Sequence, residues 1–235
     1  MIVSHKHKFI FMKTMKTASS SMEIALSEVL GEDDILTPAR GDLDVMRKGG
    51  GGGQNFRSDH PDVPRIPLWR KLLRRPERYY HPTVGFFEHM PAWRAKRYLG
   101  DEIWNSYYKF AFERNPWDRQ VSFYRYKTRS LSKEKKPGFK AFLAKGKRAQ
   151  VTNWSIYSID DEVVLDFIGR YENIDEDFKT ALKAIGLPDD MALPKANLGP
   201  KRVNRKNYQD YYDDESQKIV ADWSAGEIEY MGYEF

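Results

Sequence analysis

The sequence predicts an α/β fold in which a parallel sheet is flanked by helices. Short apolar runs alternate with amphipathic segments along the chain, the pattern of strands that are followed by helices. Polar loops follow two of these runs, and in such sheets ligands collect at the carboxyl ends of the strands. A length of 235 residues supports one substantial core without requiring a second. We therefore expect a single domain over residues 1–235.

The first strand and the helix after it are predicted from residues 9–31. Phe9–Met12 is an apolar run, and the segment after it places apolar residues on one helical face. Ser20 and Glu23 have the spacing of a capping box, so Ser20 is the expected cap. Gly31 is expected to end this helix.

Later elements follow from periodicity and from helix signals. Residues 107–112 (YYKFAF) and 163–168 predict two further strands. Asn115-Pro116 predicts a helix start, because proline is favoured at the first helical position. Further helices are expected around residues 178–185 and over 214–223.

Residues 40–80 interrupt this pattern and predict an insertion in the domain. Five consecutive glycines at 49–53 are followed by a stretch rich in proline and arginine. Two interpretations remain open: a solvated loop with a basic face, or a functional segment that forms a lid or a surface for an anionic substrate.

Composition narrows the classes of function. The chain has 39 Lys+Arg and 34 Asp+Glu, a net charge of +5, which suits an anionic ligand without requiring nucleic acid as a partner. The chain contains no cysteine, which excludes disulfides and thiolate metal sites, and we expect no metal. No apolar run approaches the roughly 20 residues of a membrane span, and no signal-peptide pattern is present. We expect a cytoplasmic protein.

The run KTASSS at residues 16–21 predicts an anion site. At a helix N-terminus, free backbone N–H groups and hydroxyls converge and the helix dipole favours negative charge. Lys16 adds a positive charge beside them. The loop lacks the glycines of G-x-x-x-x-G-K-[ST], so ATP is not the expected ligand. A surface lysine before a capping serine is the structural alternative.

A second group of polar residues lies in FERNPWDRQVSFY. Arg114 at a strand end can fork onto a phosphate, and Ser122, two turns into the next helix, can reach the same group. Arg119 instead suits a pairing with Asp118 or Glu113. The alternative is a well-capped helix with exposed charges.

Together, KTASSS and FERNPWDRQVSFY resemble the two cofactor motifs of PAPS-dependent sulfotransferases, specifically family 2, which is related to carbohydrate sulfotransferases. Loops of that family commonly read P-K-T-[AG]-[SG]-T-S; here Met15 replaces the proline and Ser20 the threonine. The resemblance covers residues 9–30 and 81–235, and the segment 31–80 does not align.

The resemblance implies a P-loop-NTPase-like fold that binds 3′-phosphoadenosine 5′-phosphosulfate (PAPS) without a metal. The sulfonate group would move to an acceptor hydroxyl or amine, and the hydroxyl of a saccharide is the expected acceptor. The product would be 3′-phosphoadenosine 5′-phosphate. Lys16 would serve the bridging oxygen, and Arg114 with Ser122 would hold the 3′-phosphate. The resemblance also implies that the 5′ end of the cofactor is bound by Thr17, Ala18, Ser19, Ser20 and Ser21. It further implies a loop that closes over the cofactor and contains Lys201, Arg202 and Arg205.

The resemblance also implies a histidine that takes the proton of the acceptor, a role suited to imidazole near neutral pH. The wording HMPA before the second motif places this histidine at His89. Glu88 and His81 are the reserve candidates.

Two other classes of function remain open. A P-loop kinase would use the same architecture with a carboxylate that holds Mg²⁺. A non-catalytic protein that binds polyanions would use the basic patches alone.

Overall fold

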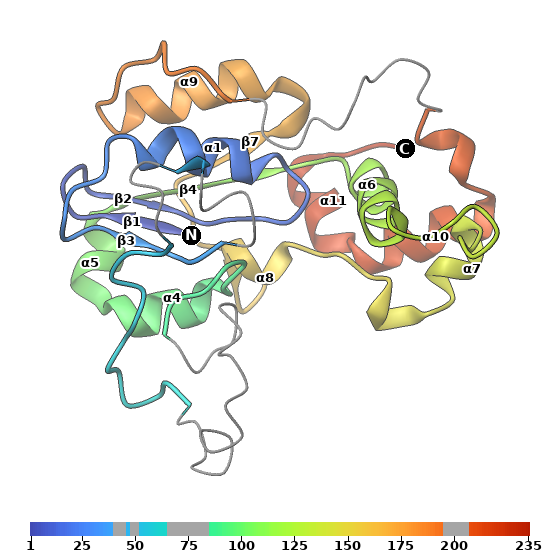
Figure 1. The fold of residues 1–235 in the computed structure, drawn as a ribbon, viewed down its shortest axis with the longest axis horizontal. Helices are drawn as coiled ribbons and strands as arrows, with labels where there is room; N and C mark the ends of the chain where they lie inside the picture. The colour runs from blue at the N-terminus through green and yellow to red at the C-terminus, as the bar shows by residue number, and fades with distance from the viewer. Residues whose placement is uncertain (40–45, 48–51, 65–84, 195–206) are drawn as a thin grey trace.

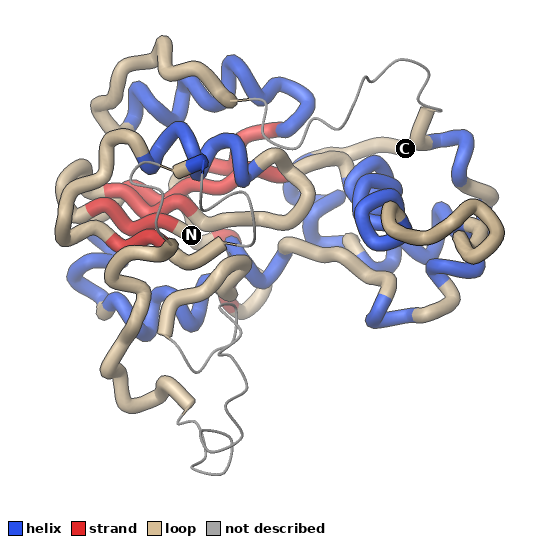
Figure 2. Tube along the Cα trace, viewed as in Figure 1, coloured by secondary structure: helices blue, strands red, loops and turns tan. Residues whose placement is uncertain are grey.

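The computed structural model describes residues 1–39, 46–47, 52–64, 85–194 and 207–235. Its centre is a five-stranded sheet in the order β3-β1-β2-β4-β7 (Figures 1 and 2). The bounds of the strands are Ile2–Ser4 for β1, Phe9–Phe11 for β2, Ile35–Leu36 for β3, Tyr108–Glu113 for β4 and Phe167–Arg170 for β7. The predicted α/β fold class is confirmed.

The sheet is parallel only in part. Strands β2, β4 and β7 run parallel, as the sequence predicts, whereas β1 pairs antiparallel with both β2 and β3. The predicted parallel sheet is therefore confirmed for β2, β4 and β7 and is extended at one edge by antiparallel strands, because residues 5–8 form a hairpin turn. A separate small hairpin joins β5 (Ser158–Ile159) to β6 (Glu162–Val163).

Helices cover both faces of the sheet (Figure 1). Helices α1 (Ser19–Ser27) and α9 (Ile174–Ala184) pack on the face that carries Phe9 and Phe11. The opposite face carries Ile10 and Met12, since side chains alternate along a strand. Three helices cover it: α4 (Ala92–Leu99), α5 (Asp101–Ser106) and α8 (Trp154–Tyr157).

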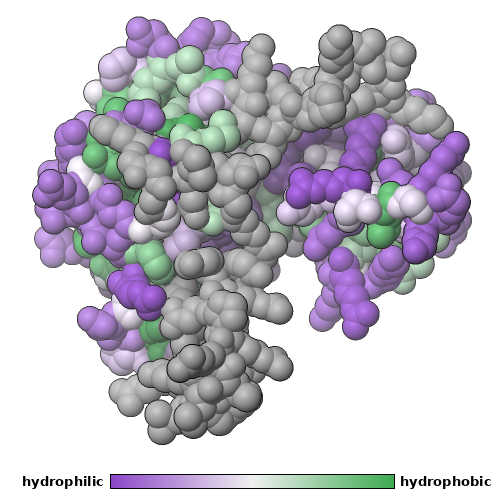
Figure 3. Space-filling model, in the orientation of Figure 1, coloured by the Kyte–Doolittle hydropathy of each residue, from purple (hydrophilic) through white to green (hydrophobic). Residues whose placement is uncertain are grey.

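A helical cluster continues from the carboxyl end of β4. It contains α6 (Pro116–Thr128), α7 (Phe139–Leu143), α10 (Asp214–Trp223) and α11 (Ala225–Met231) around its own apolar core. Hydrophilic side chains dominate its visible surface in Figure 3. Three short 3-10 turns complete the described chain: Gly146–Arg148, Tyr171–Asn173 and Gln209–Tyr211.

The two strongest helix predictions are confirmed. Asn115 caps α6, and its side chain accepts hydrogen bonds from the backbone N–H groups of Trp117 and Asp118, with Pro116 at the first helical position. Helix α10 spans the predicted residues 214–223.

The capping box predicted at Ser20 is wrong. The residue that caps α1 is Ala18, whose side chain makes no capping hydrogen bond, and the helix ends at Ser27 before Gly31 is reached. Glu23 points into the protein, where its carboxylate pairs with Lys13 and with Arg47. Buried ion pairing therefore overrides the local capping preference.

The described part of the predicted insertion is attached to the sheet edge. Gln54 exchanges backbone hydrogen bonds with Leu36, and the N–H of Phe86 donates to the carbonyl of Phe56 at 2.8 Å. Most of the glycine run and the arginine-rich stretch lie outside the described residues.

A membrane span is not found among the described helices, since none of them combines sufficient length with sufficient apolar character.

Candidate functional site

The loop between β2 and α1 is fixed by its own hydroxyl groups. Thr14 donates its hydroxyl hydrogen to the carbonyl of Phe112 on β4, at 2.5 Å. Because a hydroxyl has one hydrogen, Thr17 must donate in the 2.7 Å contact between the Thr14 and Thr17 oxygens. Ser19 donates to the carbonyl of Thr14 at 2.6 Å. The hydroxyls of Thr17 and Ser19 are thus used inside the loop.

Helix α1 presents free N–H groups at its N-terminus. Ala18 precedes the helix with a left-handed φ of 59°, and the N–H of Ser21 already donates to the carbonyl of Ala18 at 2.9 Å. Within the described chain no residue accepts a hydrogen bond from the N–H of Ser19 or Ser20. Such unsatisfied donors, together with the helix dipole, form an anion site. This arrangement suits an anionic group.

Lys16 lies between the loop and α6. Its ammonium group stands 4.5 Å from the centroid of the Tyr126 ring, and the guanidinium of Arg129 lies 4.6 Å from the same ring. Burial, with added repulsion from Arg114 and Arg129, lowers the pKa of Lys16 to about 8. The ammonium form still predominates at pH 7, but its charge is poorly compensated. A bound anion would relieve this repulsion, so the site is suited to one.

The second motif meets the first at Arg114. The Nη1 of Arg114 donates to the carbonyl of Lys16 at 3.3 Å, and its guanidinium stacks 4.1 Å from the centroid of the Tyr171 ring. Arg114 also donates to the carboxylate of Asp118, from Nε at 2.9 Å and from Nη2 at 2.5 Å. The structure therefore brings Lys16 and Arg114 together, as the order of the two motifs suggests.

Ser122 lies one helical turn beyond Asp118, on the same face of α6. Its side chain is half-buried, and no other described side chain is hydrogen-bonded to it. Tyr126 lies one turn further along this face, and its ring contacts the ammonium group of Lys16. Ser122 is accordingly placed between the Arg114–Asp118 pair and Lys16 along the helix.

His89 contacts the other side of the loop. Its Nδ1 lies 2.9 Å from the carbonyl oxygen of Lys13, and this oxygen can only accept. Nδ1 therefore carries the proton, and Nε2 keeps a lone pair. Burial and the nearby charge of Lys13 lower the pKa of His89 to about 4, so the imidazole is neutral at pH 7. No described residue is hydrogen-bonded to Nε2, so the neutral ring can accept a proton there.

The two reserve candidates differ in status. Glu88 makes a contact of 2.5 Å with the ammonium of Lys13. Although burial alone would raise the pKa of Glu88, the charge of Lys13 holds it below its usual range, so the carboxylate is already engaged. His81 lies outside the described residues, as do Lys201, Arg202 and Arg205.

Two site residues were missed by the sequence prediction. Lys13 is buried, and it joins Glu23 to Glu88 beneath the loop. Asn153 is fully buried, accepts from the N–H of Met15 at 2.8 Å and donates to the carbonyl of Met15 at 3.2 Å. The lysine inside the run FIFMK was a signal that sequence reasoning could have used. Asn153, in the stretch VTNWS, has no such signal.

A buried ionic cluster supports Asn153. Arg119 pairs with Glu113 at 2.6 Å and with Glu227 at 2.9 Å, so the predicted alternative of Glu113 as its partner is confirmed and Asp118 is not its partner. Asn153 donates to Glu113 at 3.1 Å, and its backbone N–H donates to Glu227 at 3.0 Å. Burial raises the pKa of Glu113, an effect that Arg119 opposes.

Metal ligands do not gather in the described part of the chain, where no three His, Cys, Asp or Glu side chains lie close enough to hold an ion.

Comparison with known proteins agrees with the resemblance seen in the motifs. The sequence model of the sulfotransferase family matches residues 1–231. A curated protein of Archaeoglobus fulgidus, to which no activity is assigned, is 36% identical over 105 residues, which are 43% of this chain and 87% of that protein. No match to a solved structure is found. The suspected family is confirmed.

We expect Asn153→Ala to loosen the loop. The substitution removes the partner of the half-buried N–H and carbonyl of Met15 and a donor to the buried carboxylate of Glu113, so the free energy of unfolding should fall by about 1–3 kcal/mol. Amide hydrogen exchange at Met15 should accelerate by roughly tenfold or more, since about 1.4 kcal/mol corresponds to a factor of ten in the opening equilibrium. Asn173→Ala, which removes an exposed contact to Asp177, is the matched control. Unchanged exchange at Met15 would show that the loop is held elsewhere.

Proposed function

Because the chain belongs to the sulfotransferase family, we propose that it transfers the sulfonate group of PAPS to a hydroxyl group of a carbohydrate acceptor. The observation that carries this proposal is the contact of Arg114 with the backbone of Lys16, which brings the second motif to the loop that carries the free N–H groups of Ser19 and Ser20. Two separate sites for negative charge suit a donor that carries phosphate at both its 3′ and 5′ positions.

In this proposal Lys16 acts on the leaving side of the reaction. The bond between sulfur and the bridging oxygen breaks, and negative charge builds on the 5′-phosphate. An ammonium group held beside that oxygen stabilises the charge as it develops. The N–H groups at the start of α1 hold the same end of the donor, with Thr17, Ala18, Ser19, Ser20 and Ser21 as the proposed cradle.

On the acceptor side His89 is the proposed base. Its Nε2 takes the proton of the hydroxyl as the oxygen attacks sulfur. The hydrogen bond from Nδ1 to Lys13 holds the ring in the tautomer that this step needs. Glu88 and His81 remain alternatives.

Recognition of the 3′-phosphate is assigned to Arg114 and Ser122. Arg114 already pairs with Asp118, so a phosphate would share the guanidinium with this carboxylate. Lys201, Arg202 and Arg205 would close over the donor. The cytoplasmic location and the absence of a nucleic-acid partner stay predictions from the sequence.

The decisive experiment is incubation of the chain with PAPS and a panel of saccharides, followed by mass spectrometry of the products. A sulfated product that forms equally in EDTA supports sulfonate transfer. A product that appears only with ATP and Mg²⁺ would support the kinase alternative instead. Binding without any turnover would support the polyanion-binding alternative.

The first prediction from this proposal concerns the 3′-phosphate. Adenosine 3′,5′-bisphosphate should raise the melting temperature more than AMP does at equal concentration, because the tighter ligand stabilises the folded state more by mass action. Arg114→Ala should remove most of the difference, as it deletes the forked contact. Arg97→Ala, which breaks an exposed ion pair with Asp62, serves as control. Equal shifts from both nucleotides in the parent chain would rule out a 3′-phosphate site.

The second prediction concerns Lys16. Lys16→Ala should lower kcat by roughly 10²-fold or more while the bisphosphate product still binds, because the lost contact is strongest in the transition state. Lys8→Ala is a matched control: Lys8 has a φ of 52° and Lys16 one of 65°, and Lys8 is exposed in the β1–β2 turn. Normal kcat with weakened binding would reduce Lys16 to a binding residue.

The third prediction concerns His89. Its folded pKa of about 4 lies below the ordinary 6.5, so neutral imidazole persists as the pH falls. The value of kcat/KM should therefore hold through pH 6 and decline near pH 4, since kcat/KM reports the free enzyme. His89→Ala should cost roughly 10² to 10⁴ in rate and lose this acidic limb.

The matched control for His89 is His7→Ala, because His7 also contacts a backbone carbonyl, that of Val29, at 3.2 Å. Circular dichroism at each pH separates titration from acid unfolding. The same acidic limb in His89→Ala would transfer the role to another group, and near-normal activity would make His89 structural.

A further inference from the structure

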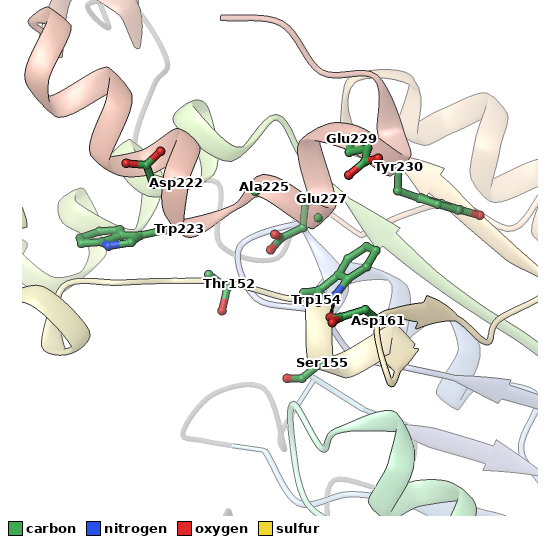
Figure 4. Close-up of a pocket in the computed structure, with 11 residues that line it drawn as sticks. Thr152, Trp154, Ser155, Asp161, Asp222, Trp223, Ala225, Glu227, Glu229 and Tyr230 are labelled. Carbon is green, nitrogen blue, oxygen red and sulfur yellow. Dashed lines mark hydrogen bonds between the residues drawn. The ribbon is translucent and has the colours of Figure 1, made fainter.

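A hollow lies on the surface formed by α8 and the C-terminal helices (Figure 4). It has a volume of about 800 Å³ and lies between α8, the junction of α10 with α11, and the turn of the β5–β6 hairpin. A smaller hollow of about 240 Å³ shares Trp154, Ser155 and Asp161 with it and extends to Trp93 on α4. We call the two together the aromatic groove.

The aromatic wall of this groove is fixed in place. Trp154 donates from Nε1 to Asp161 at 3.0 Å, and its ring meets those of Tyr157 and Tyr230 at centroid distances of 5.5 and 6.4 Å. A Cβ on Gly226 would stand 2.7 Å from the Trp154 ring, so only glycine lets α11 approach this closely. Tyr230 remains 52% exposed and offers its ring to a ligand.

The charge of the groove is opposite to that of the chain. Asp161, Asp222 and Glu229 line it, and none of its described lining residues is lysine or arginine, although the chain carries a net charge of +5. Glu227 also reaches the lining but is already paired with Arg119. Among the described residues Glu229 has no ion-pair partner, whereas Asp222 has an exposed contact with Lys218 at 3.4 Å.

The hairpin turn that positions Asp161 is costly to form. Asp160 and Asp161 have φ of 51° and 63°, the left-handed region that a two-residue turn of type I′ requires. At the second of these positions, that of Asp161, glycine meets this requirement more readily than aspartate. The carboxylate of Asp161 is thereby held against Trp154 at the rim of the groove.

The groove is connected through the backbone to both sides of the proposed reaction site. Thr152 and Trp154 flank Asn153, which holds Met15 next to Lys16. At the other end Trp93 lies four residues after His89. A ligand in the groove therefore contacts walls that are attached to the donor loop and to the proposed base.

We propose that the aromatic groove binds a part of the acceptor that carries an ammonium group. The proposal rests on the proposed sulfonate transfer only in identifying the ligand as the acceptor. Tryptophan and tyrosine rings attract cations through their faces, and carboxylates accept charge-assisted hydrogen bonds from an ammonium group. The same carboxylates repel a polyanion, so a heavily sulfated chain is excluded from the groove.

Isothermal titration calorimetry without PAPS tests the proposal with two matched probes. The tetrasaccharide of glucosamine should bind roughly tenfold or more tightly than the tetrasaccharide of N-acetylglucosamine, which has the same backbone without the charges. Raising the salt concentration should weaken the binding of the glucosamine probe. Spermidine separates the two sources of the amine: weaker binding than the glucosamine probe assigns an amino sugar, and equal binding assigns an alkylamine. Equal binding of the two tetrasaccharides overturns the proposal.

Variants locate the binding. Tyr230→Ala and Glu229→Gln should each weaken binding of the glucosamine tetrasaccharide by roughly fivefold or more. Tyr230→Phe keeps the ring and should bind this probe as tightly as the parent chain does. Glu176→Gln, at an exposed site on α9, makes the same charge change away from the groove and should have no effect. Unchanged binding in both Tyr230→Ala and Glu229→Gln also overturns the proposal.

Binding of adenosine 3′,5′-bisphosphate should be unaltered in Tyr230→Ala. This measurement keeps the two hypotheses apart: a parent chain that binds the glucosamine probe but not the bisphosphate contradicts the donor site alone, and the reverse result contradicts the groove alone.

Discussion

The rest of the site depends on the buried pairing of Arg119 with Glu113 and Glu227. Glu113 ends β4, Arg119 belongs to α6 and Glu227 to α11, so one guanidinium connects the sheet to the helical cluster. Removing one partner of such a cluster typically costs about 3–5 kcal/mol, because a charge is left buried without compensation. Asn153 attaches the donor loop to the same two carboxylates. The position of Lys16 is thus set by contacts distant in sequence.

Backbone strain gathers around this loop. Lys16, Ala18 and His89 all have φ between 57° and 65° without being glycine, and each such residue costs about 1–3 kcal/mol. A nucleotide loop with glycines would meet these torsions at little cost. Here the hydroxyls of Thr14, Thr17 and Ser19 and the side chain of Asn153 hold the loop instead. The loop keeps its shape at the expense of stability, which favours a preformed anion site.

Local signals predicted what local interactions decide. Asn115 with Pro116 gave the start of α6, because a cap and a fixed φ act within one turn. The capping box at Ser20 failed since Glu23 finds Lys13 and Arg47 across the core. The two motifs indicated the meeting of Lys16 with Arg114, but the partners of Arg114 and the role of Asn153 depend on packing between distant segments. No periodicity or propensity encodes such contacts.

The two candidate binding regions have opposite charge and share a wall. Lys16, Arg114 and Arg129 place positive charge at the donor loop, whereas Asp161, Asp222 and Glu229 place negative charge in the aromatic groove. The uncharged side chain of Asn153 is hydrogen-bonded to Met15 in the donor loop, and the next residue in the chain, Trp154, lines the groove. Under the two proposals, the groove repels the anionic donor and the donor loop repels an acceptor that carries an ammonium group. Each ligand is therefore excluded from the site of the other, which favours a complex in which both are bound at once.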